Sequence, residues 1–231
     1  MTDTLRVVLE IGKKRRVVAG AMDWPGLDRW GTSEDDALDK LSAYLPRYAG
    51  VAERAGLASA FARALEIEVV ERVPGSSSTD FWGIAHVPSQ IERGILSEAD
   101  LERRLDLLRA CWADFDDVAA GASPELRPGS RSTGRSRDQI IRHVYRTEPD
   151  QFSRKVGVRT DLEVVLTPDG LALHRQDYLD AICAYNSEGQ AARTWPIQFL
   201  VRRTAHHVMD HAWEIEDRSL EAGREVPGPL P

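Results

Sequence analysis

The chain has 231 residues, of which 42% are hydrophobic and 29% charged, and its formal net charge is −7. This composition is typical of a globular protein whose core needs neither disulfides nor a structural metal. The acidic balance argues against general nucleic-acid or membrane binding. No apolar run is long enough to cross a bilayer, and no signal-like apolar segment follows Met1, so we expect a cytoplasmic protein. Cys111 and Cys183 fall in predicted helices and are expected to be reduced.

The first predicted elements form a β-hairpin. Two runs rich in β-branched and apolar residues, Thr4 to Ile11 and Arg15 to Ala21, are joined by Gly12-Lys13-Lys14. A short turn between two such runs is typical of antiparallel strands. The stretch Asp23-Trp24-Pro25-Gly26-Leu27 is rich in turn-forming residues, and we expect a loop there.

A helix and a third strand complete a small N-terminal β-β-α-β domain, which we place at residues 1–75. Ser33 can cap the helix, and the acids at 34–36 suit the positive end of its dipole. A shorter second helix is expected over Ala52 to Ala64. Leu65 to Glu71 alternates apolar and charged residues, which is the period of a half-buried strand.

From residue 80 to residue 231 the sequence predicts a four-helix up-down bundle, so the fold class is α+β. The boundary falls at Pro74-Gly75-Ser76-Ser77-Ser78. Phe81 to Val87 is apolar and is expected to pack between the two domains, with the isolated His86 at the surface. Ser97 can cap the first bundle helix. Its apolar residues alternate three and four apart, as in bundle helices: Leu101, Leu105, Leu108, Trp112, Phe115 and Ala119.

Three further helices are expected in this domain. The second begins near Ser136 and meets Pro149, which either breaks or kinks it or opens a short helical piece through Phe152. The third runs from Leu171 to Asn186. The fourth begins at Pro196, where the missing N–H of proline costs little.

Three of the six histidines lie in the fourth predicted helix. At about 100° per residue, His207 and His211 fall on one side, near the apolar stripe that faces the bundle interior. His206 points nearly opposite, so we expect it in solvent. His174, near the start of the third helix, is also expected at the surface. His143 lies on the flank of the apolar stripe of the second helix.

His143, His207 and His211 are therefore expected to converge on one divalent metal ion. Three neutral imidazoles with an open position filled by water form a catalytic type of zinc site. Nickel, iron and manganese accept such ligands too, so the identity stays open, with zinc or nickel preferred. A bound ion would polarise an oxygen or thiol ligand and lower its pKa.

The fourth helix lacks the H-E-x-x-H pattern of zinc proteases, because Val208 follows His207. The nearest carboxylates are Asp210, which points away from His207, and Glu214, which lies on the same side as His207. Glu214 is the candidate catalytic residue, either as a base or by orienting a ligand. The alternative is a surface acid that pairs with Arg218 four residues later.

Arginines cluster between the first and second bundle helices. Arg127, Arg131, Arg135 and Arg137 lie in or beside a polar loop that runs from Gly121 to Gly134. The loop is either simply solvated or forms an anion-attracting rim near the site.

The run from about Phe81 to Leu220 resembles the DinB-like four-helix-bundle superfamily. The resemblance rests on Gly134 to Val144 in the second helix and on His207 to Trp213 in the fourth. It implies that one histidine of the second helix and an H-x-x-x-H pair of the fourth hold a metal. In this chain these are the three histidines proposed above as ligands.

Superfamily members with known activity resemble thiol-dependent S-transferases or isomerases that use mycothiol, bacillithiol or glutathione. The resemblance therefore implies a small-molecule thiol and an electrophile as partners. Arg137 and Arg142 are candidates for binding the carboxylates or sugar of the thiol. A non-catalytic metal-binding or stress-response protein is the alternative. Bundles of this type often pair, so a homodimer stays open.

The N-terminal part resembles the HicB-like antitoxin fold, in which a "proline-glycine-leucine" loop precedes an "acid-Ala-Leu" helix. The matching residues are Pro25-Gly26-Leu27 and the run from Trp30 to Leu38. This resemblance implies an antitoxin-like regulatory module as a third function. The segment contains no histidine, and nothing in the chain resembles the DNA-binding tail that such antitoxins usually append.

Overall fold

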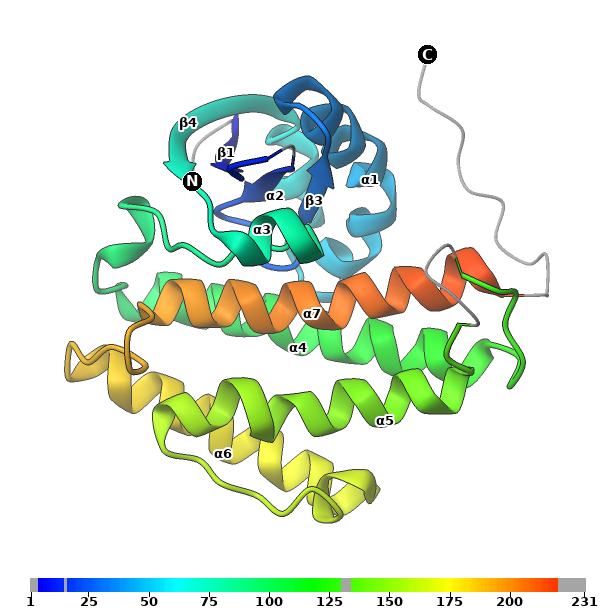
Figure 1. The fold of residues 1–231 in the computed structure, drawn as a ribbon. Helices are drawn as coiled ribbons and strands as arrows, with labels where there is room; N and C mark the ends of the chain where they lie inside the picture. Colours follow the sequence, from blue (N-terminus) through cyan, green and yellow to red (C-terminus); the bar gives the residue numbers. More distant parts are fainter. Residues whose placement is uncertain (1–3, 15, 130–133, 220–231) are drawn as a thin grey trace.

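The computed structural model describes residues 4–14, 16–129 and 134–219. In this part the fold is α+β, as predicted: a four-stranded mixed sheet is followed by a region of long helices (Figure 1). Arg131 and the tail from Glu221 lie outside these ranges. No helix within them is both long and apolar enough to span a membrane. One hydrophobic core joins the sheet to the helices, and the domain division at residues 75–80 stays a prediction.

Four strands form the sheet in the order β3-β2-β1-β4. They are β1 (Thr4–Ile11), β2 (Val17–Ala21), β3 (Asp28–Gly31) and β4 (Glu66–Pro74). β1 pairs antiparallel with β2, which confirms the hairpin, and parallel with β4, which is the expected third strand. The sequence pattern does not predict β3, because its four residues follow a turn-rich loop and include Asp28 and Arg29, residue types that are rarely buried.

Helix α1 (Glu34–Arg54) packs against β2 and β3. Ser33 caps it, since its side chain accepts a backbone N–H of the first turn, as predicted. The helix continues to Arg54, so the expected second helix shortens to α2 (Ala58–Arg63). On the buried face of α1, the Tyr48 hydroxyl donates a hydrogen bond to the Pro25 carbonyl (2.7 Å) and holds the turn-rich loop against the helix.

A short helix, α3 (Ser77–Trp82), begins where the sequence suggested a domain boundary. The expectation that residues 81–87 pack between two domains is wrong for the first two. Phe81 is 67% exposed and Trp82 is 52% exposed. The Asp80 carboxylate accepts hydrogen bonds from the backbone of the hairpin turn, which ties α3 to the sheet and leaves both rings outside the core. His86 is exposed, as expected.

Four long helices follow: α4 (Glu98–Gly121), α5 (Arg137–Thr147), α6 (Pro168–Ser187) and α7 (Ile197–Arg218). Ser97 and Ser136 cap α4 and α5 through their side chains, as predicted. All six residues of the apolar stripe predicted for α4 are buried. In α6 not every apolar residue faces the core, since Leu173 is 63% exposed.

The directions of the four helices refine the expected bundle. α4 and α7 run the same way, since Gln198 bonds to Gly94 at one end and Arg127 bonds to Arg218 at the other. α5 runs back against them. The connection to α6 returns along α5, where η4 (Val164–Leu166) packs, so α6 runs in the direction of α5. The order is therefore up-down-down-up rather than strictly alternating (Figure 1).

α5 does not stop at Pro149. It continues as a π-helical turn, η2 (Glu148–Phe152), and a 3₁₀ turn, η3 (Ser153–Val156). In the π turn the backbone N–H of Ser153 bonds to the Glu148 carbonyl. Pro149 lies at the start of this turn, where its missing N–H is tolerated. The alternative of a short helical piece through Phe152 is thus confirmed.

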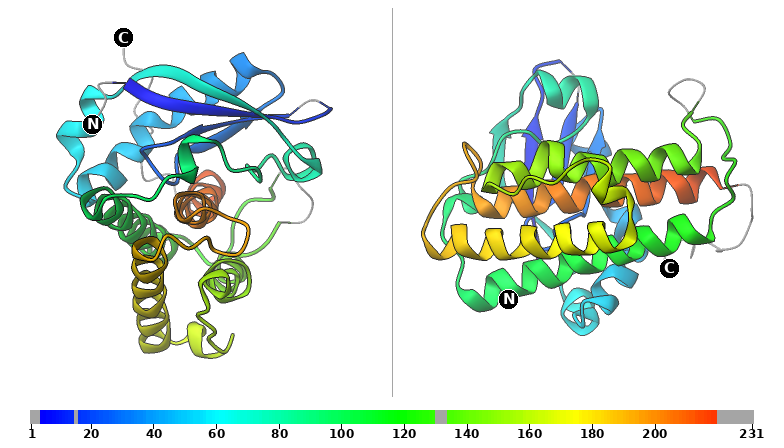
Figure 2. Two further views of the ribbon diagram at one scale, coloured as in Figure 1. Left: turned by 90° about the vertical axis from the view of Figure 1, so that its left-hand side faces the viewer. Right: turned by 90° about the horizontal axis from the view of Figure 1, so that it is seen from below.

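Helix α7 is buried on nearly all sides, because the sheet covers one side and the other helices cover the opposite side (Figure 2). Sixteen of its 22 residues are buried. The prediction that His206 lies in solvent is therefore wrong: it is 3% exposed, and its Nδ1 lies 2.6 Å from Arg203 Nη1. His174, expected at the surface, is also buried, and its Nδ1 lies 2.8 Å from Thr160 Oγ1.

A buried ion cluster joins α7 to the sheet. Arg202 of α7 donates from Nη1 to Asp28 of β3 and from Nε to Glu92 Oε1 (2.7 Å), in η1 (Ile91–Arg93). All three side chains are at most 3% exposed. Although burial opposes it, the Arg202 charge lowers the pKa of Glu92. Buried charges are tolerated when they are paired in this way. Removing one partner leaves the others buried without a counter-charge.

We expect Arg202→Ala to cost about 3–5 kcal/mol of unfolding free energy, because two buried carboxylates lose their counter-charge. Urea unfolding followed by circular dichroism measures the loss. Arg54→Ala is the matched control: it removes the Arg54–Asp117 pair, which also links the N-terminal part to α4 but is 41% and 67% exposed. That variant should lose less than about 1 kcal/mol. Equal losses in the two variants would contradict the assignment.

Candidate metal centre

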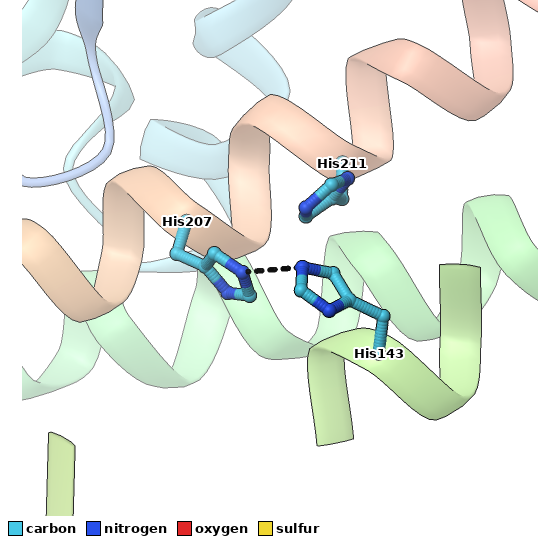
Figure 3. Close-up of side chains that lie close together, drawn as sticks. All are labelled: His143, His207 and His211. Atoms are coloured by element: carbon cyan, nitrogen blue, oxygen red, sulfur yellow. Dashed lines mark hydrogen bonds between the residues drawn. The ribbon is translucent and has the colours of Figure 1, made fainter. Parts of the chain in front are cut away.

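Three histidine side chains from α5 and α7 point toward one another (Figure 3). His207 Nε2 and His143 Nε2 are 3.3 Å apart. The ring centroid of His211 lies 4.9 Å from that of His143 and 4.8 Å from that of His207. One ligand nitrogen from each ring lies within 4.8 Å of the others. The structure thus brings together the three residues that the sequence singled out.

Helix geometry explains this convergence. His207 and His211 are four residues apart on α7, so their side chains share one face. His143 lies on α5, and its neighbours Ile140 and Val144 are fully buried, which fixes that helix against the bundle. All three histidines are half-buried, so the cluster lies at the edge of the core.

The three imidazoles fit a divalent metal ion. Two nitrogens bound about 2.0–2.1 Å from a tetrahedral ion are about 3.3 Å apart, which is the separation found between His143 and His207. His207 Nδ1 is buried without a hydrogen-bond partner in the described part of the chain. The His207 ring is instead held by packing, with the Phe152 ring centroid 5.6 Å away.

Electrostatics keep two of the rings in the form that binds metals. Burial lowers the pKa of His143 to about 4, and the nearby His211 and Arg135 contribute. Burial also lowers the pKa of His207 far below its usual value, with His211 and His143 adding to the effect. Both imidazoles are therefore neutral at pH 7, and a metal ion need not displace a proton from either.

A carboxylate orients the third ring. His211 Nδ1 lies 2.8 Å from Glu214 Oε2, and Glu214 Oε1 accepts a hydrogen bond from Arg218 Nη1 (2.6 Å). Although burial opposes it, the contacts with His211 and Arg218 lower the pKa of Glu214. An ionised Glu214 favours the tautomer of His211 with its proton on Nδ1, which leaves Nε2 free for a metal. Glu214 thus contacts both His211 and Arg218, so the pairing with Arg218 is confirmed; its roles in orienting a metal ligand and as a base stay predictions.

Arg218 extends this chain of contacts to the connection between α4 and α5. Its Nε donates to the Arg127 carbonyl (2.8 Å) and its Nη2 to the Arg135 carbonyl (2.6 Å). The sequence predicts only the pairing of Glu214 with Arg218, from their spacing of four residues. The long-range carbonyl partners have no sequence signal, because they depend on where the connection folds back.

Asp210 points away from the histidine trio, as expected. Its carboxylate accepts a hydrogen bond from Arg29 Nη2 (2.6 Å), and the Arg29 guanidinium stacks on the rings of Tyr44 and Trp213. These contacts anchor β3 to α7 one turn from His207. Asp210 therefore contributes to the interface with the sheet.

Arg137 and Arg142, the candidates for thiol binding, have no contact with the trio among the described residues. Arg137 donates to the Ala122 carbonyl (2.8 Å) and to Asp138. Arg142 is exposed and lines a depression of about 470 Å³ between α5 and the segment at η4, together with Asp138 and Glu163. Their role in binding a thiol stays a prediction.

Comparisons with models of protein families, with curated proteins and with solved structures found no match for this chain. The mixed sheet, the helical region and the histidine trio are compatible with the resemblances stated above.

Glu214→Gln is expected to weaken metal affinity about tenfold or more, because the neutral amide no longer holds His211 in the ligating tautomer. Competition with a chromophoric chelator measures the dissociation constant. Glu163→Gln, which removes a surface acid paired with Arg146, is the control and should bind as the unmodified chain does. An unchanged affinity in Glu214→Gln would show that Glu214 serves only Arg218.

Proposed function

We propose that the chain binds one divalent metal ion through His143, His207 and His211. The observation that supports this most directly is the convergence of three imidazole nitrogens within 4.8 Å from two helices. The neutral state of two rings and the carboxylate on His211 agree with it. Imidazole ligands favour zinc or nickel among the common ions.

The donor set is that of a catalytic centre. Three protein ligands leave one position of a tetrahedral ion open, whereas structural zinc sites fill all four. When bound, a divalent ion supplies a Lewis acid that lowers the pKa of a thiol or water in the open position. The residue after His207 is Val208, which is fully buried in the core. This helix therefore lacks the glutamate base that zinc proteases carry at that position. Peptide hydrolysis is therefore not the favoured reaction.

We propose a thiol-dependent S-transferase or isomerase, as the DinB-like resemblance implies. In the transfer, the sulfur of a small thiol forms a bond to an electrophilic carbon of the substrate, the leaving group departs with its electron pair, and the thiol proton passes to solvent. Glu214 fixes the orientation and the tautomer of the His211 ring through its carboxylate. Phe152 covers one side of His207 and excludes water there. A non-catalytic metal-binding protein is the second candidate, favoured because Glu214, the candidate base, is already engaged by His211 and Arg218.

Purified protein should contain about one divalent ion per chain by elemental analysis, and stripped protein should regain it. His143→Ala and His207→Ala should each lose stoichiometric binding, because two imidazoles alone hold an ion weakly. His86→Ala, which removes an exposed histidine, should keep it. The metal assignment would be wrong if the purified chain held no stoichiometric metal, or if the His207→Ala variant bound the metal as the unmodified chain does.

Metal-loaded protein should accelerate thioether formation between a small thiol and an electrophile. Glutathione, bacillithiol and mycothiol are tested in turn with chlorodinitrobenzene, and the product is followed by its absorbance. His207→Ala should reduce the rate to the uncatalysed level. If none of the three thiols reacts faster with loaded protein than in buffer, the non-catalytic alternative replaces the enzyme.

A further inference from the structure

A pocket of about 210 Å³ lies between the end of the α5 segment and the connection from α6 to α7. Asp150, Gln151, Arg154 and Lys155 line it from η2 and η3, and Arg193 lines it from the connection. The pocket is separate from the depression beside Arg142. No residue of the metal centre lines it, so its chemistry has to be judged on its own.

The charges in this pocket are unbalanced. Asp150 is the only carboxylate among its lining residues, and that carboxylate lies 3.3 Å from Arg154 Nη1. No ion pair of Lys155 or Arg193 with a carboxylate is found in the described part of the chain. Burial lowers the pKa of Lys155, and the Arg193 and Arg154 charges lower it further. Two cations thus face one pocket without a counter-ion, in a chain whose net charge is −7.

The lysine is held in place by an aromatic ring. Lys155 Nζ lies 4.0 Å from the centroid of the Trp195 ring, within the range of a cation–π interaction. Trp195 is itself packed edge-on against Phe199 of α7, with ring centroids 4.9 Å apart. The ammonium group is therefore positioned at the pocket rather than left free in solvent.

The arginine is held by a strained turn. Ala192 and Trp195 exchange two backbone hydrogen bonds (2.8 and 3.1 Å), which close a turn over Arg193 and Thr194. Arg193 has a φ of +60°, and it is the one residue other than glycine with a positive φ in the described ranges. Glycine or asparagine adopts this conformation at lower cost, since a Cβ is penalised by about 1–2 kcal/mol. The position keeps a long cation there in spite of that cost, which points to a role for the side chain.

We propose that this pocket binds the anionic group, a phosphate or a carboxylate, of a small molecule. Lys155 contributes a point charge and Arg193 a guanidinium that can bind two oxygens at once. The proposal goes beyond the metal-dependent function and does not depend on it. The two regions share a structural element, because Phe152, which packs on His207, lies three residues before Lys155.

Isothermal titration of the full chain with inorganic phosphate, at ionic strength held constant with sodium chloride, tests the proposal. Saturable binding is expected. Lys155→Gln and Arg193→Asn should each weaken it about tenfold or more, as the loss of a charge-assisted hydrogen bond does. Asparagine accepts the left-handed backbone, so Arg193→Asn should keep the fold. Arg159→Gln is the matched control: it removes an exposed arginine four residues after Lys155 that does not line the pocket, and its affinity should be unchanged.

A titration with acetate distinguishes the two anions: tighter binding of phosphate assigns a phosphate group, and tighter binding of acetate a carboxylate. The His207→Ala variant separates this site from the metal centre, since it should bind phosphate as the unmodified chain does. Loss of phosphate binding in His207→Ala would place the anion on the metal and overturn the proposal. So would the absence of saturable binding of either anion, or an equal loss of affinity in Arg159→Gln.

Discussion

The fold depends on the burial of one helix from two sides. α7 packs against α4 and α5 on one side and beneath the sheet on the other. Its sheet-facing side is polar as well as buried, and Arg202 there meets carboxylates from β3 and η1. Charges without water cost several kcal/mol each unless their partners are fixed in place. The rotation of α7 about its axis is consequently set by ion pairs on one side and by apolar packing on the other.

A fixed α7 is what allows three histidines to form a site. Metal ligands have to be held to within about half an ångström, and side chains on packed helices meet that demand better than side chains on loops. The orientation of α7 sets the direction of the His207 and His211 side chains. Arg29 of β3 holds the same helix in place through its hydrogen bond to Asp210. Glu214 and Arg218 then connect His211 to the backbone that leads into α5, the helix of His143. The N-terminal sheet thus supports the centre although it supplies no ligand among the described residues.

Much of this could be predicted from helical periodicity and capping signals alone. Ser33, Ser97 and Ser136 cap helices where the sequence placed them, and the spacing of His207 and His211 was enough to put both on one face. Periodicity fails where a helix has a second partner. The polar residues of the sheet-facing side of α7 look like a solvent face, so periodicity predicts His206 in water, whereas it is buried between the residues of α7 that bond to β3, Arg202 and Asp210. The direction of α6 cannot be predicted from the sequence either, because the length of the connection from α5 does not indicate along which helix the chain returns.

The π turn at Glu148–Phe152 has a consequence for the surroundings of His207. Phe152 follows His143 by nine residues, which in an unbroken α-helix is about 180° around the axis, on the opposite side. A π turn inserts one extra residue and rotates the subsequent residues back by about 100°. Phe152 thereby lies about 80° from His143 rather than opposite it, and both rings reach His207. A single widened turn at a proline thus lets a residue beyond the regular part of α5 contact His207.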